Sequence, residues 1–223
     1  MNEKLNGFSV CGVSVIQAGS ISELSHAGGK YHLTCTAPSA ADLPRFIELR
    51  DKIEKYKDNF WWSRKVRLLK AELEAIPQKV MWDDVIDNVV TTVGGNNMLD
   101  NHLSGSAYTA AWYIGLISAT GYTSAPVIAD TAASHAGWAE DQNYSQATRI
   151  AAAFSAASAK SKALSAALNF SINATTTIKG AFLISNSTKG GTTGILYSAG
   201  LATGGDRAVI NGDTLAVSYT ASV

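Results

Sequence analysis

The chain has 223 residues, and its 18 Lys and Arg balance 18 Asp and Glu, so its formal net charge is zero. Neutralising a phosphate backbone requires an excess of cations, so this composition argues against a dedicated nucleic-acid-binding protein. Only 16% of the residues are charged and 46% are hydrophobic, a balance that can fill a core and excludes wholesale disorder. No apolar run approaches the roughly 18 residues that cross a bilayer, so no membrane partner is expected.

The cysteines and the first residues indicate the compartment. Two cysteines, Cys11 and Cys35, are too few for a disulfide-rich scaffold. Met1–Lys4 carries one acid and one base, and the apolar stretch that follows is interrupted by Ser and Gly, unlike a signal peptide. We therefore expect a protein that is made and kept in a reducing cytoplasm, with both thiols free.

The first segment, residues 1–41, contains short β-type runs separated by glycines, which predict an extended arm. The arm is too interrupted to hold a core alone, so we expect it to order against a neighbouring protein by strand pairing or wrapping. Four of its apolar residues are candidate interface residues: Phe8, Val10, Val13 and Val15.

The second segment, residues 42–95, is predicted to be helical. Residues 42–88 hold ten acids and ten bases, which are 20 of the 36 charges of the chain. Two apolar stripes with helical spacing run through them: Phe46, Leu49, Ile53, Tyr56 and Phe60, and then Val66, Leu69, Leu73 and Ile76. Because the stripes are out of register by one residue, we expect two helices within 43–76 that form a hairpin and break near Trp61–Ser63.

The hairpin supplies the second group of candidate interface residues. They face either a core or another subunit: Phe46, Leu49, Ile53, Tyr56, Phe60, Trp61 and Trp62. The Trp61–Trp62 pair stands beside Arg64, Lys65 and Arg67 and could stack on nucleic-acid bases. The acids of the same helices favour packing or a protein interface instead, so no direct nucleic-acid binding is expected.

A third, shorter helix is predicted from about Trp82 to Val93. It would bury one apolar face and end at Gly94–Gly95. The residues of that face are Val85, Ile86, Val89 and Val90. Residues 89–223 carry only twelve charges, and this shift in composition marks a change of architecture.

Residues 96–223 are predicted to form an antiparallel β domain. Apolar residues recur at every second position within 164–172, 178–184 and 215–221, which indicates strands with one buried face. The expected inward residues are Leu168, Phe170, Ile172, Phe182, Ile184, Leu215, Val217 and Tyr219. The Ala-rich stretch 150–168 could instead form a helix, but its regular serines and its apolar spacing of two favour two strands and a turn.

The predicted fold class is therefore mainly β with an α-helical N-terminal insertion. An extended arm (1–41) and a helical segment (42–95) precede an antiparallel β-sandwich or jelly roll (96–223). Further strand candidates at 107–118, 148–156, 194–201 and 207–211 are separated by turns rich in Gly, Asn and Asp.

Residues with chemical potential are few. His135, Trp138, Glu140 and Asp141 form the densest group, and either a catalytic acid or base or a loop plugged by Trp138 would explain it; the plug is favoured. Asp206 and Asp213 lie in neighbouring Gly-rich turns and could hold Ca²⁺, although two acids seldom suffice. The four histidines lack partners at metal-ligand spacing. We expect no cofactor, no metal and no enzymatic activity.

Residues 81–223, roughly two-thirds of the chain, contain several distinctive motifs, which lie within Met81–Gly94, Gly105–Leu116, Ala133–Trp138, Lys189–Gly200 and Gly212–Thr220. These motifs resemble those of a family of tailed-bacteriophage virion proteins. The resemblance implies a component of the particle that decorates or cements the capsid, and it supplies no catalytic residues. Residues 1–80 show no such resemblance.

This resemblance sets the expected partners and location. A decoration protein is made in the host cytoplasm, resides in the virion, and binds the major capsid protein and further copies of itself, most simply as a homotrimer. A tail, fibre, neck or baseplate component is the alternative, because the stripe Phe46–Phe60 would suit a fibre stalk. A virion glycan hydrolase is a remote alternative, since its only candidate pair, Glu140 and Asp141, would point apart in a strand.

Overall fold

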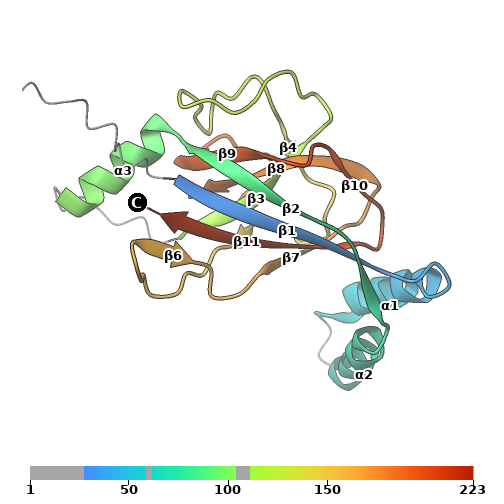
Figure 1. Cartoon of the computed structure of the whole chain (residues 1–223). Coiled ribbons are helices and arrows are strands. Elements are labelled where there is room, and N and C mark those ends of the chain that lie inside the picture. The colour runs from blue at the N-terminus through green and yellow to red at the C-terminus, as the bar shows by residue number, and fades with distance from the viewer. Residues whose placement is uncertain (1–27, 59–61, 104–110, 223) are drawn as a thin grey trace, which may run out of the picture.

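The structure is a computed structural model that describes residues 28–58, 62–103 and 111–222 (Figure 1). The candidate interface residues Phe8, Val10, Val13, Val15, Phe60 and Trp61 lie outside the described residues. The elements of the first half are β1 (Gly28–Pro38), α1 (Leu43–Tyr56), α2 (Ser63–Glu74), β2 (Gln78–Val90) and α3 (Thr92–Leu103). Those of the second half are β3 (Tyr113–Ser118), β4 (Glu140–Asp141), β5 (Ile150–Ala151), β6 (Ser161–Ala163), β7 (Leu168–Ser171), β8 (Thr176–Ile184), β9 (Leu196–Ala202), β10 (Arg207–Val209) and β11 (Thr214–Ser222).

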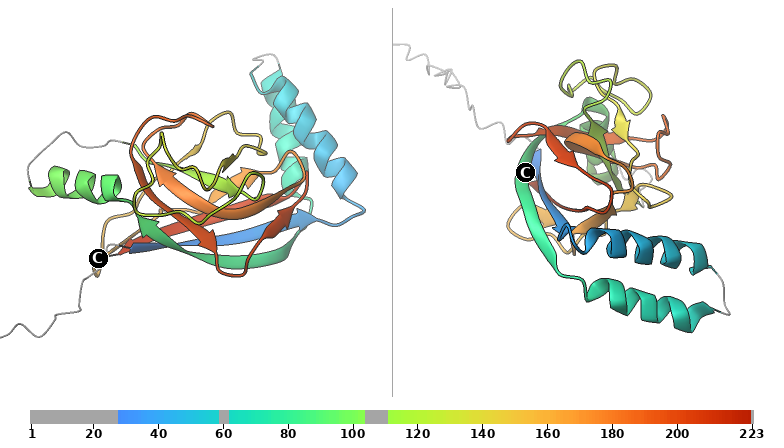
Figure 2. Two further views of the ribbon diagram at one scale, coloured as in Figure 1. Left: turned by 90° about the horizontal axis from the view of Figure 1, so that it is seen from above. Right: turned by 90° about the vertical axis from the view of Figure 1, so that its right-hand side faces the viewer.

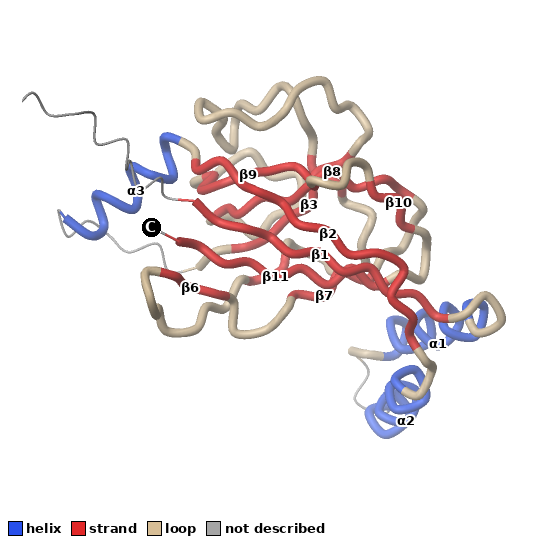
Figure 3. The backbone as a smooth tube through the Cα atoms, in the orientation of Figure 1, coloured by secondary structure: helices blue, strands red, loops and turns tan. Residues whose placement is uncertain are grey.

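Within the described residues, eleven strands form one continuous sheet in which every pair of neighbours is antiparallel. The order is β4-β3-β8-β9-β2-β1-β11-β6, with β10 beside β8, β5 beside β3 and β7 beside β11. Figure 3 shows that strands make up the body and that helices lie at its two ends. The predicted class, mainly antiparallel β with a helical insertion, is therefore confirmed.

The sheet curls around one hydrophobic core. Leu33 of β1, Ile114 of β3 and Val217 of β11 are fully buried in the same cluster, although their strands are separated by several others in the sheet. Single bridges between Tyr144 and Ile172 and between Phe154 and Leu164 join the two sides of the curl. The two facing layers, visible end-on in Figure 2, thus belong to one sheet and pack in a sandwich-like way.

Alternation predicted the inward residues well, with one difference. Phe170, Ile172, Leu215, Val217 and Tyr219 are buried in the main cluster, and Leu168 packs partly buried against it. Phe182 and Ile184 are buried too, but in a second cluster that also contains Trp138 and Leu196. Strand β8 is covered on both faces, because the segment between β3 and β4 folds over its outer side.

The helical hairpin is confirmed, and it is inserted between two paired strands. Strands β1 and β2 pair along most of their length, from Lys30–Asp87 to Pro38–Gln78, and α1 and α2 connect their ends. The ladder contains a bulge: Cys35 pairs with Trp82 and Thr36 with Val80, so Met81 is an extra residue on β2. The hairpin is thus carried at the tip of a β ribbon.

Two sequence expectations are wrong. Residues 82–90 form most of β2 instead of a helix, and the third helix, α3, begins at Thr92 and contains Gly94 and Gly95. The spacing of Val85, Ile86 and Val89 suits a helix, but pairing with β1 and β9 on either side decides the structure.

The second error concerns residues 28–38, which were expected to belong to an arm. They form β1, which lies between β2 and β11 and buries Tyr31, Leu33 and Cys35 completely. Residues 28–38 are therefore part of the body, and the boundaries predicted at 41 and 95 do not separate helical from β structure. The helical alternative for 150–168 is also excluded, because this stretch contains β5 and β6.

Candidate functional site

The interior of the helical hairpin uses several of the predicted interface residues. Phe46 and Leu49 of α1 are buried in a small cluster with Ile76, and Leu69 and Leu73 of α2 pack against it. Phe46 and Leu49 therefore hold the two helices together and are not free for a partner. Ile53, one turn further along α1, is half-buried.

The tip of the hairpin, which we define as Lys55, Tyr56, Trp62 and Lys65, combines aromatic and basic residues. The rings of Tyr56 and Trp62 stack with their centroids 4.9 Å apart and an interplanar angle of 21°. The Lys65 ammonium lies 4.3 Å from the Trp62 ring centroid, and that of Lys55 lies 5.6 Å from the Tyr56 centroid. Trp62 remains 37% exposed. Trp and Tyr are among the residue types that dominate binding energy at protein interfaces.

The hairpin projects away from the body (Figure 2). At its base, Arg50 donates a hydrogen bond from Nη1 to the carbonyl oxygen of Ile172 at 2.9 Å. Leu43 packs so closely on Gly212, which has a φ of +104°, that a Cβ there would meet the leucine. The contacts of Leu43 and Arg50 thus hold the first two turns of α1 against the body, and the tip lies at the distant end of both helices.

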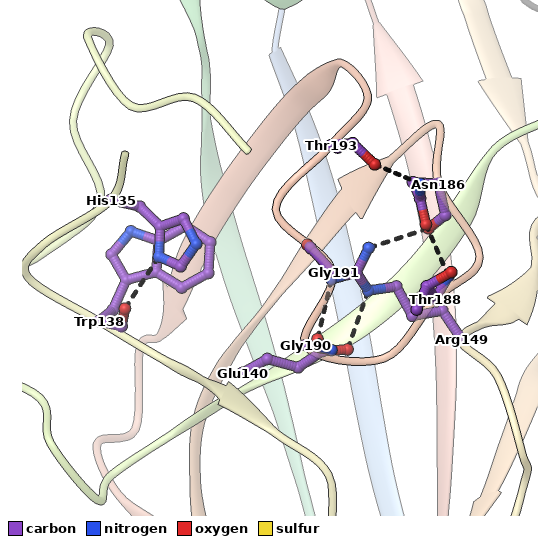
Figure 4. Close-up of polar contacts among 9 residues, drawn as sticks. All are labelled: His135, Trp138, Glu140, Arg149, Asn186, Thr188, Gly190, Gly191 and Thr193. Carbon is purple, nitrogen blue, oxygen red and sulfur yellow. Dashed lines mark hydrogen bonds and ion pairs between the residues drawn. The ribbon is translucent and has the colours of Figure 1, made fainter. Parts of the chain in front are cut away.

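The second candidate region is the loop pocket, a cavity of about 240 Å³ beside β4 and the loop 185–195 (Figure 4). Its central feature is the ion pair of Glu140 and Arg149, whose side chains are only 5% and 3% exposed. Arg149 donates from Nε and Nη2 to the two carboxylate oxygens, at 2.9 and 2.8 Å. Such a buried pair requires that every remaining donor is satisfied.

The loop satisfies two more of the five N–H groups of Arg149. Arg149 donates from Nη1 to the carbonyl of Asn186 and from Nη2 to that of Gly191, while the backbone N–H of Gly190 donates to Glu140. Gly190 has a φ of +66°, which glycine adopts readily. The loop closes on itself as well, because Asn186 donates to Thr193 and accepts from the N–H of Thr188.

His135 and Trp138 form the other wall of the loop pocket. Their rings stack at 4.1 Å, and His135 Nδ1 lies 2.9 Å from the carbonyl oxygen of Trp138. Trp138 is buried against Phe182 and donates from Nε1 to Asp130. The prediction of a loop plugged by Trp138 is thus the one that the geometry favours, with the ring on the face of β8 instead of at the end of the sandwich.

The carboxylates of this region are engaged in structural bonds. Asp141 accepts hydrogen bonds from Thr176 and from the backbone N–H of Asn143. Glu140 is held by Arg149, so both carboxylates are bonded to other groups of the protein. The arrangement fixes loops and offers no pair of carboxylates facing one bond.

The proposed calcium ligands do not come together. Asp206 forms an ion pair with Lys179, and Asp213 is buried, accepting from the N–H of Ile210 and the thiol of Cys35. Among the described residues, no group of three or more His, Cys, Asp or Glu is arranged to hold a metal ion. No helix in this part of the chain is long and apolar enough to span a membrane.

Sequence reasoning missed two ion pairs of the body whose carboxylates are buried. Arg149 is the single Lys or Arg between residues 80 and 159, and such an isolated cation in an apolar stretch signals a dedicated partner. The second pair joins Asp84 to Arg207, with Oδ2 and Nε 2.7 Å apart. Asp84 lies in the stretch that helical spacing misassigned, and an acid in a central strand is unusual enough to have signalled a specific role.

No protein-family model matches the chain, and no curated protein is detectably similar to it. The resemblance of residues 81–223 to phage virion proteins therefore rests on its motifs alone.

Proposed function

We propose that the protein is a structural component of a tailed-bacteriophage particle, namely a capsid decoration or cement protein that binds the major capsid protein lattice. It acts by binding, without turnover and without a cofactor, and it resides in the virion as a homotrimer. The motifs within residues 81–223 support the class of protein. The hairpin that projects from the β body supports the mode of action, and it is the observation on which the proposal mainly depends.

The division between body and hairpin suits this role. The body is held by an extensive core and by two ion pairs with buried carboxylates, so it can present the hairpin at a fixed base. The tip offers an aromatic stack flanked by two lysines, which fits an acidic, partly apolar patch on a partner protein. A cement that binds only the assembled lattice stabilises that lattice by mass action.

Specific contacts disfavour two of the alternative functions, the fibre stalk and the glycan hydrolase. A fibre stalk would need the stripe of α1 to face another copy, but Phe46 and Leu49 pack against α2 of the same chain. A glycan hydrolase would need two available carboxylates, and those of Glu140 and Asp141 are engaged. A tail or neck location with the same binding mode is distinguished by copy number, since a decoration protein is present in hundreds of copies per particle.

The test is particle binding by a double variant of the tip. Purified wild-type protein or variant is added to particles that were assembled without it. The double variant Tyr56→Ala with Trp62→Ala should bind these particles with an affinity that is lower by roughly 30-fold or more, because truncating one central aromatic residue costs about 2 kcal/mol. The matched control is Val127→Ala with Ile128→Ala, which removes two apolar side chains that are 52% and 63% exposed elsewhere on the body.

Particle stability gives a second readout. Virions that carry the wild-type protein or the control should release DNA at a higher temperature than virions without it. Particles with the tip variant should resemble those without the protein. Identical release curves for all of them, together with a copy number of only a few, would contradict the cement role and favour the tail.

A further inference from the structure

An apolar cleft is lined by residues of α3, β6 and the end of β11, among others. These three elements lie at the end of the body opposite the helical hairpin (Figure 1). The volume of the cleft is about 570 Å³, within the range of small-molecule sites, and the mouth of a curled sheet is a common place for such sites. We call it the end cleft. It is separate from the loop pocket and from the hairpin tip, with no lining residue in common.

The walls of the end cleft are aromatic and aliphatic. Trp112 meets Tyr197 edge-on at 5.5 Å, and Phe154 meets Tyr219 edge-on at 6.2 Å. Leu183 closes the inner side, where the cleft meets the main core. Rings held in this way offer a rigid apolar surface, so a ligand that binds here must have an apolar body.

The charges of the end cleft are all of one sign. Lys160 and Lys162 line its rim, and the described lining residues include no acid. Lys162 donates to the carbonyl of Ser155 at 2.8 Å. Lys160 makes no hydrogen bond or ion pair to any residue in the described part of the chain. A ligand with an anionic head would therefore meet one uncommitted ammonium group.

The backbone at Lys160 provides an independent observation. Ala159 and Lys160 have φ values of +49° and +59°, and they form the two-residue turn between Ser158 and Ser161. Turns of this kind favour Asn-Gly, because other residues are strained in the left-handed region. A strained lysine where glycine would be preferred points to a role for its side chain, and the side chain lies on the rim of the end cleft.

We propose that the end cleft is a binding site for an amphipathic anion of the fatty-acid type. The acyl chain lies between the Trp112–Tyr197 and Phe154–Tyr219 pairs, and the carboxylate is held by Lys160. This site is independent of the proposed function, because it involves neither the hairpin nor a partner protein.

The test uses the purified full chain and decanoate below its micelle concentration, followed by titration calorimetry. Decanoate should bind at one site per chain. Decyltrimethylammonium, which has the same chain length and the opposite charge, should bind at least about fivefold more weakly. Equal affinities would show that the lysine rim does not select the head group, and absence of decanoate binding would overturn the site altogether.

Two variants of the same turn separate binding from stability. Lys160→Gly should weaken decanoate binding about fivefold while leaving the melting temperature equal or higher, because glycine relieves the strain. Ala159→Gly relieves strain in the same turn and keeps the lysine, so it should bind decanoate like the wild type. Equal loss in both variants, or loss in neither, would contradict the assignment of the carboxylate to Lys160.

Discussion

The β body and the helical hairpin are stabilised in different ways. In the body, large side chains such as Tyr31, Phe170 and Val217 are fully buried, and residues distant in sequence meet in one core. The hairpin buries Phe46, Leu49 and Ile76 in a cluster of its own. Its two helices hold together mainly by local packing, whereas the body depends on long-range pairing.

The ion pairs of the body also differ from those of the hairpin. The ion pairs Glu140–Arg149 and Asp84–Arg207 of the body have nearly buried carboxylates and tie loops to strands. Those of the hairpin, such as Arg45–Glu72 and Glu48–Lys52, are exposed. Exposed pairs contribute little to stability, while a buried pair is costly to break. The body therefore uses charge to fix geometry, and the hairpin uses it mainly as a solvated surface.

The largest effect is expected from a charge placed in the core of the body. Phe170→Asp would bury an unpaired carboxylate at a fully buried position and should cost more than about 4 kcal/mol, so the body should not fold. Circular dichroism in the near ultraviolet, which reports fixed aromatic rings, should lose its signal.

The matched substitution in the hairpin is Phe46→Asp. It should reduce the helical signal in the far ultraviolet while the body keeps its near-ultraviolet signal, because the hairpin core is separate. Global unfolding by Phe46→Asp would show that the two regions are one cooperative unit.

A smaller effect is expected from breaking a buried ion pair. Arg149→Ala leaves the Glu140 carboxylate buried without its partner and should destabilise the protein by about 3–5 kcal/mol. For a chain of this length the melting temperature should fall by roughly 10 °C. Arg45→Ala, which removes an exposed pair of the hairpin, should change it by no more than about 2 °C. Similar shifts for both variants would contradict the distinction between the two kinds of pair.

The third prediction concerns acid stability. Burial raises the pKa of Asp84, but hydrogen bonds from Arg207, from the N–H groups of Val85 and Gly204, and from Thr203 hold it below its ordinary value. A lowered folded-state pKa adds stability that is complete above the ordinary Asp pKa of about 3.9 and is lost as the pH falls through the folded value.

Asp84→Asn should therefore lower the free energy of unfolding by about 1–3 kcal/mol at pH 7. The difference in the free energy of unfolding between variant and wild type, measured by urea unfolding, should become smaller below about pH 4. Asp87→Asn is the control, because Asp87 pairs with Lys30 at an exposed site on the same strand. A gap that stays constant with pH would show that the Asp84 carboxylate does not supply this stability.

The smallest effect on the body is expected from removing the hairpin entirely. Pro38 and Gln78 are paired at the end of the β1–β2 ladder, so an Asn-Gly turn can replace residues 39–77 without a change of register. The body should fold with nearly the same melting temperature, and particle binding should be lost. Failure to fold would show that the base contacts of Leu43 and Arg50 are essential to the body.

The sequence predicted what depends on local periodicity. The break between α1 and α2 followed from two stripes out of register, and the inward residues of β7 and β11 followed from alternation. The error at 82–90 has a physical reason: β2 is stabilised by partners that lie about 50 residues before it and 110 after it, and no local pattern encodes them.

The candidate sites were predictable to different degrees. Aromatic residues at the hairpin break were recognised, but their stacking with Lys65 depends on how the two helices approach each other. The loop pocket was recognised as a cluster around Trp138 and Glu140. The role of Arg149 as the partner of Glu140 was not recognised, because the two residues are nine positions apart in the sequence and the segment between them is mostly irregular. The end cleft could not be recognised from a sequence motif, because its lining residues come from many separate segments.

The extra residue Met81 in β2 has a consequence for the whole hairpin. A bulge bends its strand and increases the local twist, and this one lies in the ribbon between the body and the helices. One residue therefore sets the direction in which the helices, each about 20 Å long, leave the body, so a small rotation at the bulge displaces the tip by a larger distance. Deleting Met81 would leave the core and the two helices intact and would change the direction in which the tip points relative to the body.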